Sequence, residues 1–417
     1  MIIKRDNYLE QLISGEKNGL IKIVTGIRRC GKSYLLFTLF HDYLIAKGID
    51  RNHIIEIALD DRKNVKLRDP DDILKYIKGQ IKDKKLYYII LDEVQLIKEF
   101  EDVLNSLLHI KNVDVYVTGS NSKFLSSDIV TEFRGRGDQI HMYPLSFSEF
   151  KSAFFGSIEE AWKQYYTFGG LPQILSLGMD RKKMDYLRDI FESVYIADII
   201  ERNSIRNDEE LKELVQILAS GIGGLTNPAK LVNTFKSIKK SSISRNTVVN
   251  YMDYMRDSFL IEKAMRFDIK GKKYIDTPVK YYFSDLGLRN AILSFRQQEE
   301  NNIMENIVYN ELRIRGYSVD IGVIDTYGKD DNRKTVRKQL EVDFIANKGN
   351  KKYYIQSVFR LSTEEKREQE ERSLLKIDDS FQKVIIIGDD IYPKRNEKGI
   401  LTIGIKQFLL DENSLEL

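Results

Sequence analysis

One glycine-rich segment constrains the fold more than any other feature. It reads Gly26-Ile27-Arg28-Arg29-Cys30-Gly31-Lys32-Ser33 and matches the pattern G-x-x-x-x-G-K-[ST]. A short β-type run precedes it at residues 21–24, and a helix-forming run without Gly or Pro follows at residues 33–40. In a strand, loop and helix in this order, backbone N–H groups and a helix N-terminus surround a chain of phosphates. The sequence therefore predicts an α/β domain with a phosphate-binding loop.

The expected ligands of this loop are ATP and Mg²⁺. Lys32 would reach the β- and γ-phosphates, and the Ser33 hydroxyl would ligate Mg²⁺. The two arginines inside the loop have two interpretations: they face the phosphates, or they hold acidic residues of the same domain. The predicted nucleotide-binding residues are Gly26, Ile27, Arg28, Arg29, Cys30, Gly31, Lys32, Ser33 and Tyr34.

A second motif is an apolar run at residues 87–91 that ends in Asp92 and Glu93. The apolar run is typical of a central parallel strand covered on both faces, and the carboxyl ends of such strands meet where open α/β sheets bind ligands. Asp92 would orient Mg²⁺ through its water shell, and Glu93 would polarise the water that attacks the γ-phosphorus. The alternative for two adjacent acids is a solvated strand end.

Two further strands are predicted at residues 53–59 and 113–118, and small polar residues follow the second one. Asn121, with Ser120 behind it, would hydrogen-bond the γ-phosphate or the attacking water; the alternative is the N-cap of the next helix. Arg134 and Arg136 lie in a glycine-flanked loop and would present guanidinium groups to a phosphate, in cis or to a neighbouring copy. The alternative is that they bind a carboxylate or lie in solvent.

Together these motifs resemble the prokaryotic AAA-type ATPases, P-loop NTPases akin to the archaeal-type ATPases and more distantly to the signal-transduction NTPases. The resemblance is carried by Gly26-Ile27-Arg28-Arg29-Cys30-Gly31-Lys32-Ser33, Leu91-Asp92-Glu93-Val94-Gln95, Thr118-Gly119-Ser120-Asn121-Ser122, Arg134-Gly135-Arg136 and Pro144-Leu145-Ser146-Phe147-Ser148-Glu149-Phe150. It continues through Gly169-Gly170-Leu171-Pro172 into a C-terminal half that is a domain of unknown function in the most similar group. The resemblance implies ATP binding and, by inference, hydrolysis.

Pattern changes and the resemblance predict four parts. They are a P-loop ATPase domain at residues 1–148, a helical lid at 149–222, a winged helix-turn-helix at 223–285 and an α/β domain at 286–417. Residues 226–282 carry 12 Lys and Arg against 5 Asp and Glu, so the basic excess is concentrated in the winged-helix part.

A basic winged helix suggests double-stranded DNA as a partner. The second helix would face the major groove and the wing would contact phosphates, through Arg245, Asn246, Asn250, Lys270, Lys272 and Lys273. The alternative is that this part packs against the ATPase domain or a protein partner, with the lysines as solvated turn residues.

The C-terminal part looks like a PD-(D/E)xK nuclease core, an α/β restriction-endonuclease-like fold. A helix containing Glu305 and Glu311 precedes a series of strands, and Asp343 and Gln356 take two of the metal-site positions. The lysine position fails, because Val358 stands two residues after Gln356 on the same strand face. We therefore expect a degenerate core that binds nucleic acid or a partner, and no nuclease activity.

Composition excludes several other classes. Cys30 is the only cysteine and there are 4 histidines, which excludes a disulfide scaffold and a structural zinc site. The longest apolar stretches are about six residues, far below the roughly 20 of a membrane span. The first residues are charged and lead into no apolar segment, so we expect no signal peptide and a cytoplasmic protein.

These observations predict an ATP-hydrolysing enzyme that couples its nucleotide state to DNA or to a protein partner. The alternative is a nucleotide-regulated DNA-binding switch with little turnover. A homo-oligomer, in which Arg134 or Arg136 reaches a neighbour's site, is a further possibility, and a metal-dependent nuclease is the weakest one.

Overall fold

A computed structural model describes residues 2–119, 135–239, 243–296, 299–329 and 335–417 of the chain. The described chain forms two compact units. The first consists of Met1–Pro144 with Asp257–Phe259, and the second of Leu145–Arg256 with Leu260–Leu417. The four predicted parts do not map one-to-one on these two units, and their boundaries stay predictions.

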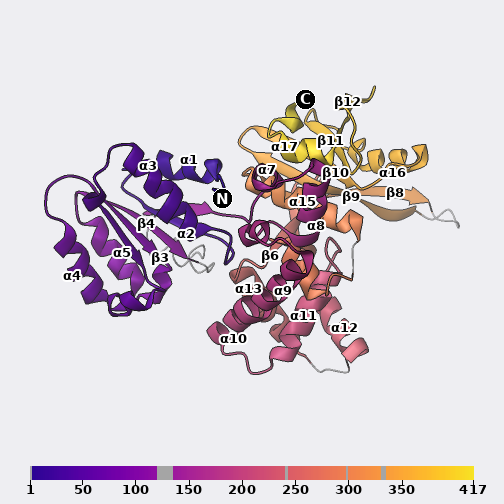
Figure 1. The fold of residues 1–417 in the computed structure, drawn as a ribbon. Helices are drawn as coiled ribbons and strands as arrows, with labels where there is room; N and C mark the ends of the chain where they lie inside the picture. The colour runs from indigo at the N-terminus through magenta and orange to yellow at the C-terminus, as the bar shows by residue number, and fades with distance from the viewer. Residues whose placement is uncertain (1, 120–134, 240–242, 297–298, 330–334) are drawn as a thin grey trace. The chain divides into compact units, whose positions relative to one another are not determined.

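The first unit contains a five-stranded sheet in the order β2-β3-β4-β1-β5, and every neighbouring pair is parallel (Figure 1). The strands are β1 (Ile21–Thr25), β2 (Ile54–Ala58), β3 (Tyr87–Asp92), β4 (Val113–Gly119) and β5 (Gly137–His141). The sequence predicted the first four to within one residue at each end. It missed β5, a half-exposed edge strand that is mostly polar and lacks the apolar run that marks the others.

The helices of the first unit pack on this sheet around a core of Ile, Leu, Val and Tyr side chains from β1, β2, β3 and β4. After the glycine-rich segment the chain continues as one helical run through α2 (Lys32–Tyr34), η1 (Leu35–Phe40) and α3 (His41–Ala46). The remaining helices are α1 (Asp6–Ser14), η2 (Arg51–His53), η3 (Arg62–Arg68), α4 (Pro70–Gln80), η4 (Val94–Leu96) and α5 (Phe100–Leu108).

The second unit has a helical part built around α14 (Leu286–Ile292), in which every residue is buried. Helices α8, α9, α11 and α15 all contact it. The helices up to residue 257 are α7 (Phe147–Ala153), α8 (Ile158–Phe168), η6 (Pro172–Ser176), α9 (Asp180–Ile190), η7 (Phe191–Ile196), α10 (Ala197–Asn203), α11 (Asp208–Ser220), α12 (Pro228–Lys239) and α13 (Arg245–Asp257). None of the described helices of the chain combines the length and the apolar character that a membrane crossing requires.

A buried carboxylate joins α14 to the end of α8. Asp285 caps α14, with one oxygen 3.0 Å from Leu288 N and the other 2.8 Å from Gly170 N. The backbone around it leaves no room for side chains: a Cβ on Gly169 would lie 2.3 Å from an Asp285 oxygen, and one on Gly287 would lie 2.0 Å from Phe168 O. This contact gives the Gly169-Gly170-Leu171-Pro172 segment a structural role inside the second unit.

The second unit also contains an eight-stranded mixed sheet in the order β12-β13-β11-β10-β9-β8-β6-β7 (Figure 1). Its strands are β6 (Ile261–Asp268), β7 (Lys273–Phe283), β8 (Ser318–Lys329), β9 (Thr335–Lys348), β10 (Lys351–Val358), β11 (Gln382–Ile387), β12 (Lys394–Arg395) and β13 (Leu401–Gly404). The predicted wing is the hairpin β6–β7, and β6 pairs with β8 in parallel. The hairpin is therefore continuous with the C-terminal sheet, and the winged helix stays a prediction.

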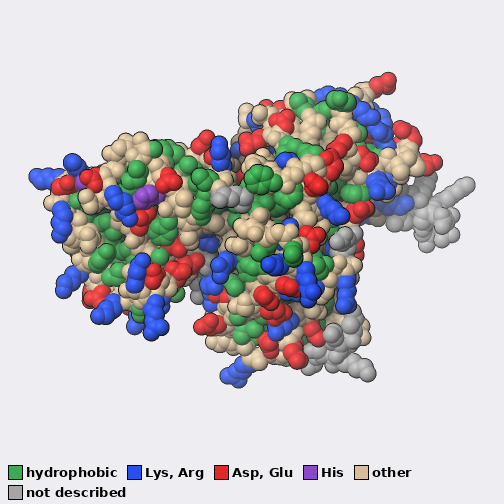
Figure 2. Space-filling model, viewed as in Figure 1, with side chains coloured by type: hydrophobic (Ala, Val, Ile, Leu, Met, Phe, Trp, Pro, Cys, Tyr) green, Lys and Arg blue, Asp and Glu red, His purple; other side chains and the backbone are tan. Residues whose placement is uncertain are grey.

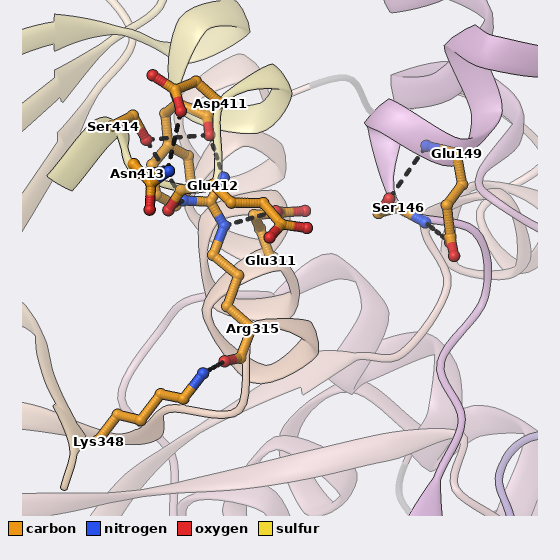
Figure 3. Close-up of polar contacts among 10 residues, drawn as sticks. Ser146, Glu149, Glu311, Arg315, Lys348, Asp411, Glu412, Asn413 and Ser414 are labelled. Carbon is orange, nitrogen blue, oxygen red and sulfur yellow. Dashed lines mark hydrogen bonds and ion pairs between the residues drawn. The ribbon is translucent and has the colours of Figure 1, made fainter. Parts of the chain in front are cut away.

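The remaining helices of the second unit are α15 (Glu300–Ile314), α16 (Glu364–Leu374), α17 (Ile405–Leu410) and η8 (Ser414–Glu416). Arg315 ties the end of α15 to the C-terminal tail (Figure 3). Its guanidinium donates to the Glu311 carboxylate at 2.7 Å, to Glu412 O at 3.1 Å and to Ser414 Oγ at 3.3 Å. Burial raises the pKa of Glu311, and the charge of Arg315 opposes this rise.

The clearance at Gly287 can be tested by adding one methyl group. Because its Cβ would collide with a backbone carbonyl, Gly287→Ala should lower the unfolding free energy of the second unit by about 1–3 kcal/mol. The chain has a single tryptophan, Trp162 on α8, so denaturation followed by tryptophan fluorescence reports this unit. Gly178→Ala is the matched control, because nothing lies within 4 Å of its added Cβ. An unchanged Gly287→Ala midpoint would contradict the close packing described here.

Candidate functional site

The glycine-rich loop follows directly from β1 and leads into α2. Gly26 has a φ of 141°, and a Cβ there would lie 2.1 Å from Met142 O, so only glycine fits. Gly31 has a φ of 106° at the residue before α2. These two glycines therefore let the chain turn sharply between the strand and the helix.

The loop is held from within the first unit by Arg5, which is 1% exposed. The Arg5 guanidinium donates to Cys30 O at 3.2 Å and to Tyr143 O at 2.7 Å. The Cys30 thiol lies 3.5 Å from Met142 O. The sequence analysis missed Arg5, because nothing in the local pattern marks an arginine 25 residues away as a partner of the loop.

Lys32 is 5% exposed and folds back on the loop that precedes it. Its ammonium donates to Gly26 O at 3.0 Å and to Ile27 O at 3.1 Å. Arg28 is partly buried, and Arg29 is exposed with a φ of 66°. Tyr34 ends α2 and is partly buried.

The carboxylate of Asp92 lies at the end of β3, opposite the start of α2. The Ser33 hydroxyl is 2.9 and 3.0 Å from its two oxygens, and the Thr118 hydroxyl donates to one of them at 2.5 Å. Burial raises the pKa of Asp92, and the two hydroxyl donors oppose this rise. The predicted Mg²⁺ residues, Ser33 and Asp92, therefore lie together in space.

Glu93 follows in the left-handed conformation, with a φ of 54°. Its backbone N–H donates to Thr118 Oγ1 at 2.9 Å, so one buried hydroxyl contacts both acids of the motif. The Gln95 side-chain amide donates to the Glu93 carboxylate. Thr118 was not among the functional residues that the sequence predicted. Its position at the end of the strand next to β3 is the feature that could have identified it.

Of the other predicted catalytic residues, the structure describes only Arg136. Asn121, Ser120 and Arg134 lie outside the described residues. Arg136 is exposed directly before β5, and its carbonyl accepts from Ile21 N at 2.9 Å.

The predicted DNA-contacting residues lie in the second unit and are all exposed. Three are on α13 and three are at the β6–β7 turn: Arg245, Asn246, Asn250, Lys270, Lys272 and Lys273. On the visible face of the molecule, basic and acidic side chains are interspersed (Figure 2). Exposure makes contact with a partner possible and does not distinguish DNA from protein.

A second charged group surrounds Lys280, which lies on β7 and is 3% exposed. Its ammonium is 2.9 Å from Glu305 Oε1 and 2.7 Å from Glu341 Oε1. The Tyr282 hydroxyl donates to Glu305 Oε1 at 2.6 Å. Asp343 is partly buried beside this group, and we call these residues, Lys280, Tyr282, Glu305, Glu341 and Asp343, the lysine–carboxylate cluster.

The two predicted remnants of a nuclease core contact each other at this cluster. Gln356 Oε1 accepts from Asp343 N at 2.8 Å, and Asp343 Oδ2 accepts from Ser357 N at 2.8 Å. The sequence analysis missed Lys280, which brings an ammonium from a distant strand to a site where Val358 supplies none. In the described part of the chain, no group of three or more His, Cys, Asp and Glu is arranged to hold a metal ion.

Family models and curated proteins similar to this chain are known. A model of the AAA domain family matches residues 18–151, and a model of a domain of unknown function, DUF8612, matches residues 159–299. An uncharacterized protein of Haemophilus influenzae is 33% identical over 98% of this chain and 99% of its own length. An uncharacterized protein of Methanocaldococcus jannaschii, MJ1544, is 30% identical over 94% of this chain and 86% of its own length.

Among solved structures, the chain is similar to the Walker-type ATPase PABY2304 of Pyrococcus abyssi. The identity is 15% and the TM-score 0.48, over 70% of this chain and 96% of the other. The Aeropyrum pernix Orc1 protein, solved in complex with DNA, matches with 11% identity and a TM-score of 0.34, over 70% and 92% of the two chains. Likenesses this distant carry no argument about activity.

The carboxyl group of the partly buried Asp343 makes the stability of the second unit depend on pH. Burial raises its pKa to about 8, from 3.8 for an ordinary aspartate. The folded chain therefore binds more protons than the unfolded chain between these two values, and stability falls as pH rises through this window, by at most about 1.4 kcal/mol per pH unit.

Asp343→Asn should remove this pH-dependent component, because the amide cannot ionise. The measurement is denaturation of both proteins at pH 5, 6, 7 and 8, followed by Trp162 fluorescence. Asp276→Asn, at an exposed position on β7, serves as the control and should keep the wild-type slope. Equal slopes for the wild type and Asp343→Asn would contradict the assignment.

Proposed function

We propose that this chain, which belongs to the same family as the uncharacterized H. influenzae and M. jannaschii proteins and matches the AAA domain over residues 18–151, binds ATP with Mg²⁺ and hydrolyses it at the end of β1, β3 and β4. One observation carries the proposal. Ser33 of the loop and Asp92 of β3 are hydrogen-bonded to each other, and Thr118 joins Asp92 to the Glu93 backbone. Three of the residues that the chemistry needs, Ser33, Asp92 and Glu93, are therefore linked through hydrogen bonds.

The oxygen atoms of this site fit a magnesium ion. Mg²⁺ takes oxygen ligands and commonly binds through one or two carboxylates together with phosphate oxygens and water, and the Ser33 hydroxyl and the Asp92 carboxylate are of this kind. When bound, Mg²⁺ neutralises the charge that develops on the phosphates. We assign Ser33 to direct ligation and Asp92 to holding the water shell.

The residues of the loop would bind and orient the phosphates. Backbone N–H groups around residues 26–34 and the N-terminal end of the helical run that begins with α2 would surround the phosphate chain. Lys32 now donates to two loop carbonyls, and its ammonium would exchange them for β- and γ-phosphate oxygens. Arg28 and Arg29 would face the phosphates or hold nearby acids.

Glu93 would accept the proton of the attacking water or polarise it. Its carboxylate is contacted by the Gln95 amide, which fixes the side chain until a water molecule competes for it. Asn121 would orient the same water, and Arg134 or Arg136 would stabilise the transferred phosphate, in the same chain or in a neighbouring copy.

We further propose that nucleotide state is coupled to a partner through the second unit. The exposed basic residues of α13 and the β6–β7 turn support double-stranded DNA, and the interspersed charges in Figure 2 support a protein equally. The alternative function, a nucleotide-regulated switch with little turnover, would use the same nucleotide site.

We also propose a cytoplasmic location for the protein.

For the lysine–carboxylate cluster we propose a core without nuclease chemistry. The Lys280 ammonium sits within hydrogen-bonding distance of two carboxylates and neutralises charge that would otherwise attract a divalent cation. Asp343 and Gln356 bind backbone N–H groups and each other. The cluster therefore serves to join β7, α15 and β9.

Steady-state ATP hydrolysis with Mg²⁺ tests the proposed enzyme. Glu93→Gln should keep ATP binding and lower kcat about 100-fold or more, because general-base catalysis contributes about 10²–10⁴-fold. Lys32→Ala should weaken ATP binding itself. Glu99→Gln is the matched control, an exposed acid six residues along the chain that should leave turnover unchanged.

The same assay, with and without double-stranded DNA, separates the partners. Turnover that requires Glu93 and rises with DNA supports DNA coupling, and turnover indifferent to DNA points to a protein partner. ATP binding with no turnover in any condition would replace the enzyme by the switch.

Thr118 allows a second test, of positioning. Thr118→Val keeps the shape but removes the donor to Asp92 and the acceptor for Glu93 N–H, so we expect kcat to fall about tenfold while KM for ATP changes little. Thr118→Ser restores the hydroxyl and should recover most of the activity. If Val and Ser variants lose activity equally, the hydroxyl has no positioning role.

A further inference from the structure

The second unit contains a small cavity between α8 and α15, and its lining residues are not those of the lysine–carboxylate cluster. Its volume is about 110 Å³, below the roughly 300–1,000 Å³ of pockets that hold whole small molecules, so it suits a single side chain. The lining residues are Trp162, Tyr166, Glu300, Ile303, Met304 and Phe359. We call this the aromatic–acidic pocket.

The walls of the pocket are fixed by contacts outside it. Trp162 packs edge to face against the buried Phe147, with ring centroids 5.6 Å apart. The Tyr166 carbonyl accepts from Asn290 Nδ2 at 3.1 Å. Phe359 N donates to Asn301 Oδ1 at 3.1 Å, and Phe359 O accepts from Gly388 N at 3.1 Å. The pocket is therefore formed before any occupant arrives.

The lining chemistry selects for a cation on an apolar stem. Aromatic faces attract cations through their ring quadrupole, and Trp162 and Tyr166 present rings tilted by 54° to each other. Glu300 adds an exposed carboxylate, which makes no ion pair with the other residues that the structure describes. Ile303 and Met304 supply apolar surface for methylene groups.

One ring that lines the pocket already contacts a guanidinium group of the same chain. Arg360 places its guanidinium carbon 5.5 Å from the centroid of the Phe359 ring. A planar guanidinium stacks on aromatic rings and pairs with a carboxylate through two parallel hydrogen bonds, which a compact ammonium cannot do. Arginine therefore matches an aromatic wall with one carboxylate better than lysine does.

We propose that the aromatic–acidic pocket binds an arginine side chain of a protein partner. The proposal is independent of ATP hydrolysis, because no residue of the pocket belongs to the nucleotide site. It assigns the second unit a protein-recognition site with a positively charged anchor as its ligand.

The single tryptophan of the chain lines this pocket, so its fluorescence reports occupancy directly. The full-length protein is titrated with N-acetyl-arginine methylamide and, in parallel, with the citrulline, lysine and norleucine equivalents. We expect a saturable change with arginine in the millimolar range, which is about 4 kcal/mol of binding free energy. Citrulline, which has the same shape without the charge, should bind at least fivefold more weakly.

Variants connect the signal to the pocket and leave Trp162 in place. Glu300→Gln and Tyr166→Leu should each weaken arginine binding about fivefold, and Glu368→Gln, at an exposed position on α16, should not. Matching denaturation midpoints confirm that the variants fold.

Each other result overturns the proposal. Equal binding of citrulline and arginine would show that the pocket does not distinguish a charged side chain from a neutral one. Tighter binding of lysine would show that the pocket prefers an ammonium group. Preference for norleucine would make it an apolar pocket. No saturation with any probe, or no effect of the pocket variants, would remove the site.

Discussion

The geometry of the candidate site in the first unit depends on one buried hydroxyl. Thr118 Oγ1 donates to the Asp92 carboxylate and accepts from the Glu93 backbone N–H, so it fixes both acids at once. It can do so because β3 and β4 pair in parallel with Leu91 opposite Val117, which brings the two strand ends to the same edge of the sheet. A slip of one residue would turn Thr118 to the other face of the sheet. The site is thus a consequence of strand register.

A buried carboxylate has the corresponding role in the second unit. Asp285 accepts backbone N–H groups from Leu288, three residues away, and from Gly170, 115 residues away in sequence, and its burial raises its pKa to about 6. The desolvation penalty that this pKa reports is offset only if the backbone approaches closely, which the missing side chains of Gly169 and Gly287 permit. Gly169 and Gly287 are therefore needed for a tight junction between α8 and α14.

Sequence patterns predicted the features that depend on residues close together in the chain. The strands β1 to β4 came from apolar runs and the loop from its glycines. The features that the sequence did not predict depend on contacts between distant residues. Arg5 contacts Cys30 and Tyr143, and Lys280 contacts Glu305 and Glu341. No period or motif encodes such pairs. Along β10, Val358 stands at the lysine position after Gln356, and the folded sheet brings the ammonium of Lys280 from another strand, β7.

Contacts between distant residues also decide how much of the basic excess of residues 226–282 is accessible to a partner. Its 12 Lys and Arg residues suggest a surface for a phosphate backbone, but a buried cation cannot contribute to one and a cation paired with a carboxylate contributes less. Lys280 is enclosed by carboxylates, Arg266 is 6% exposed and donates to Gln339, and Arg256 pairs with Asp253. The charge that remains accessible is therefore smaller than the sequence count. Because the aromatic–acidic pocket of the same unit favours a cationic ligand, a partner with basic side chains fits the second unit better than the count alone would suggest.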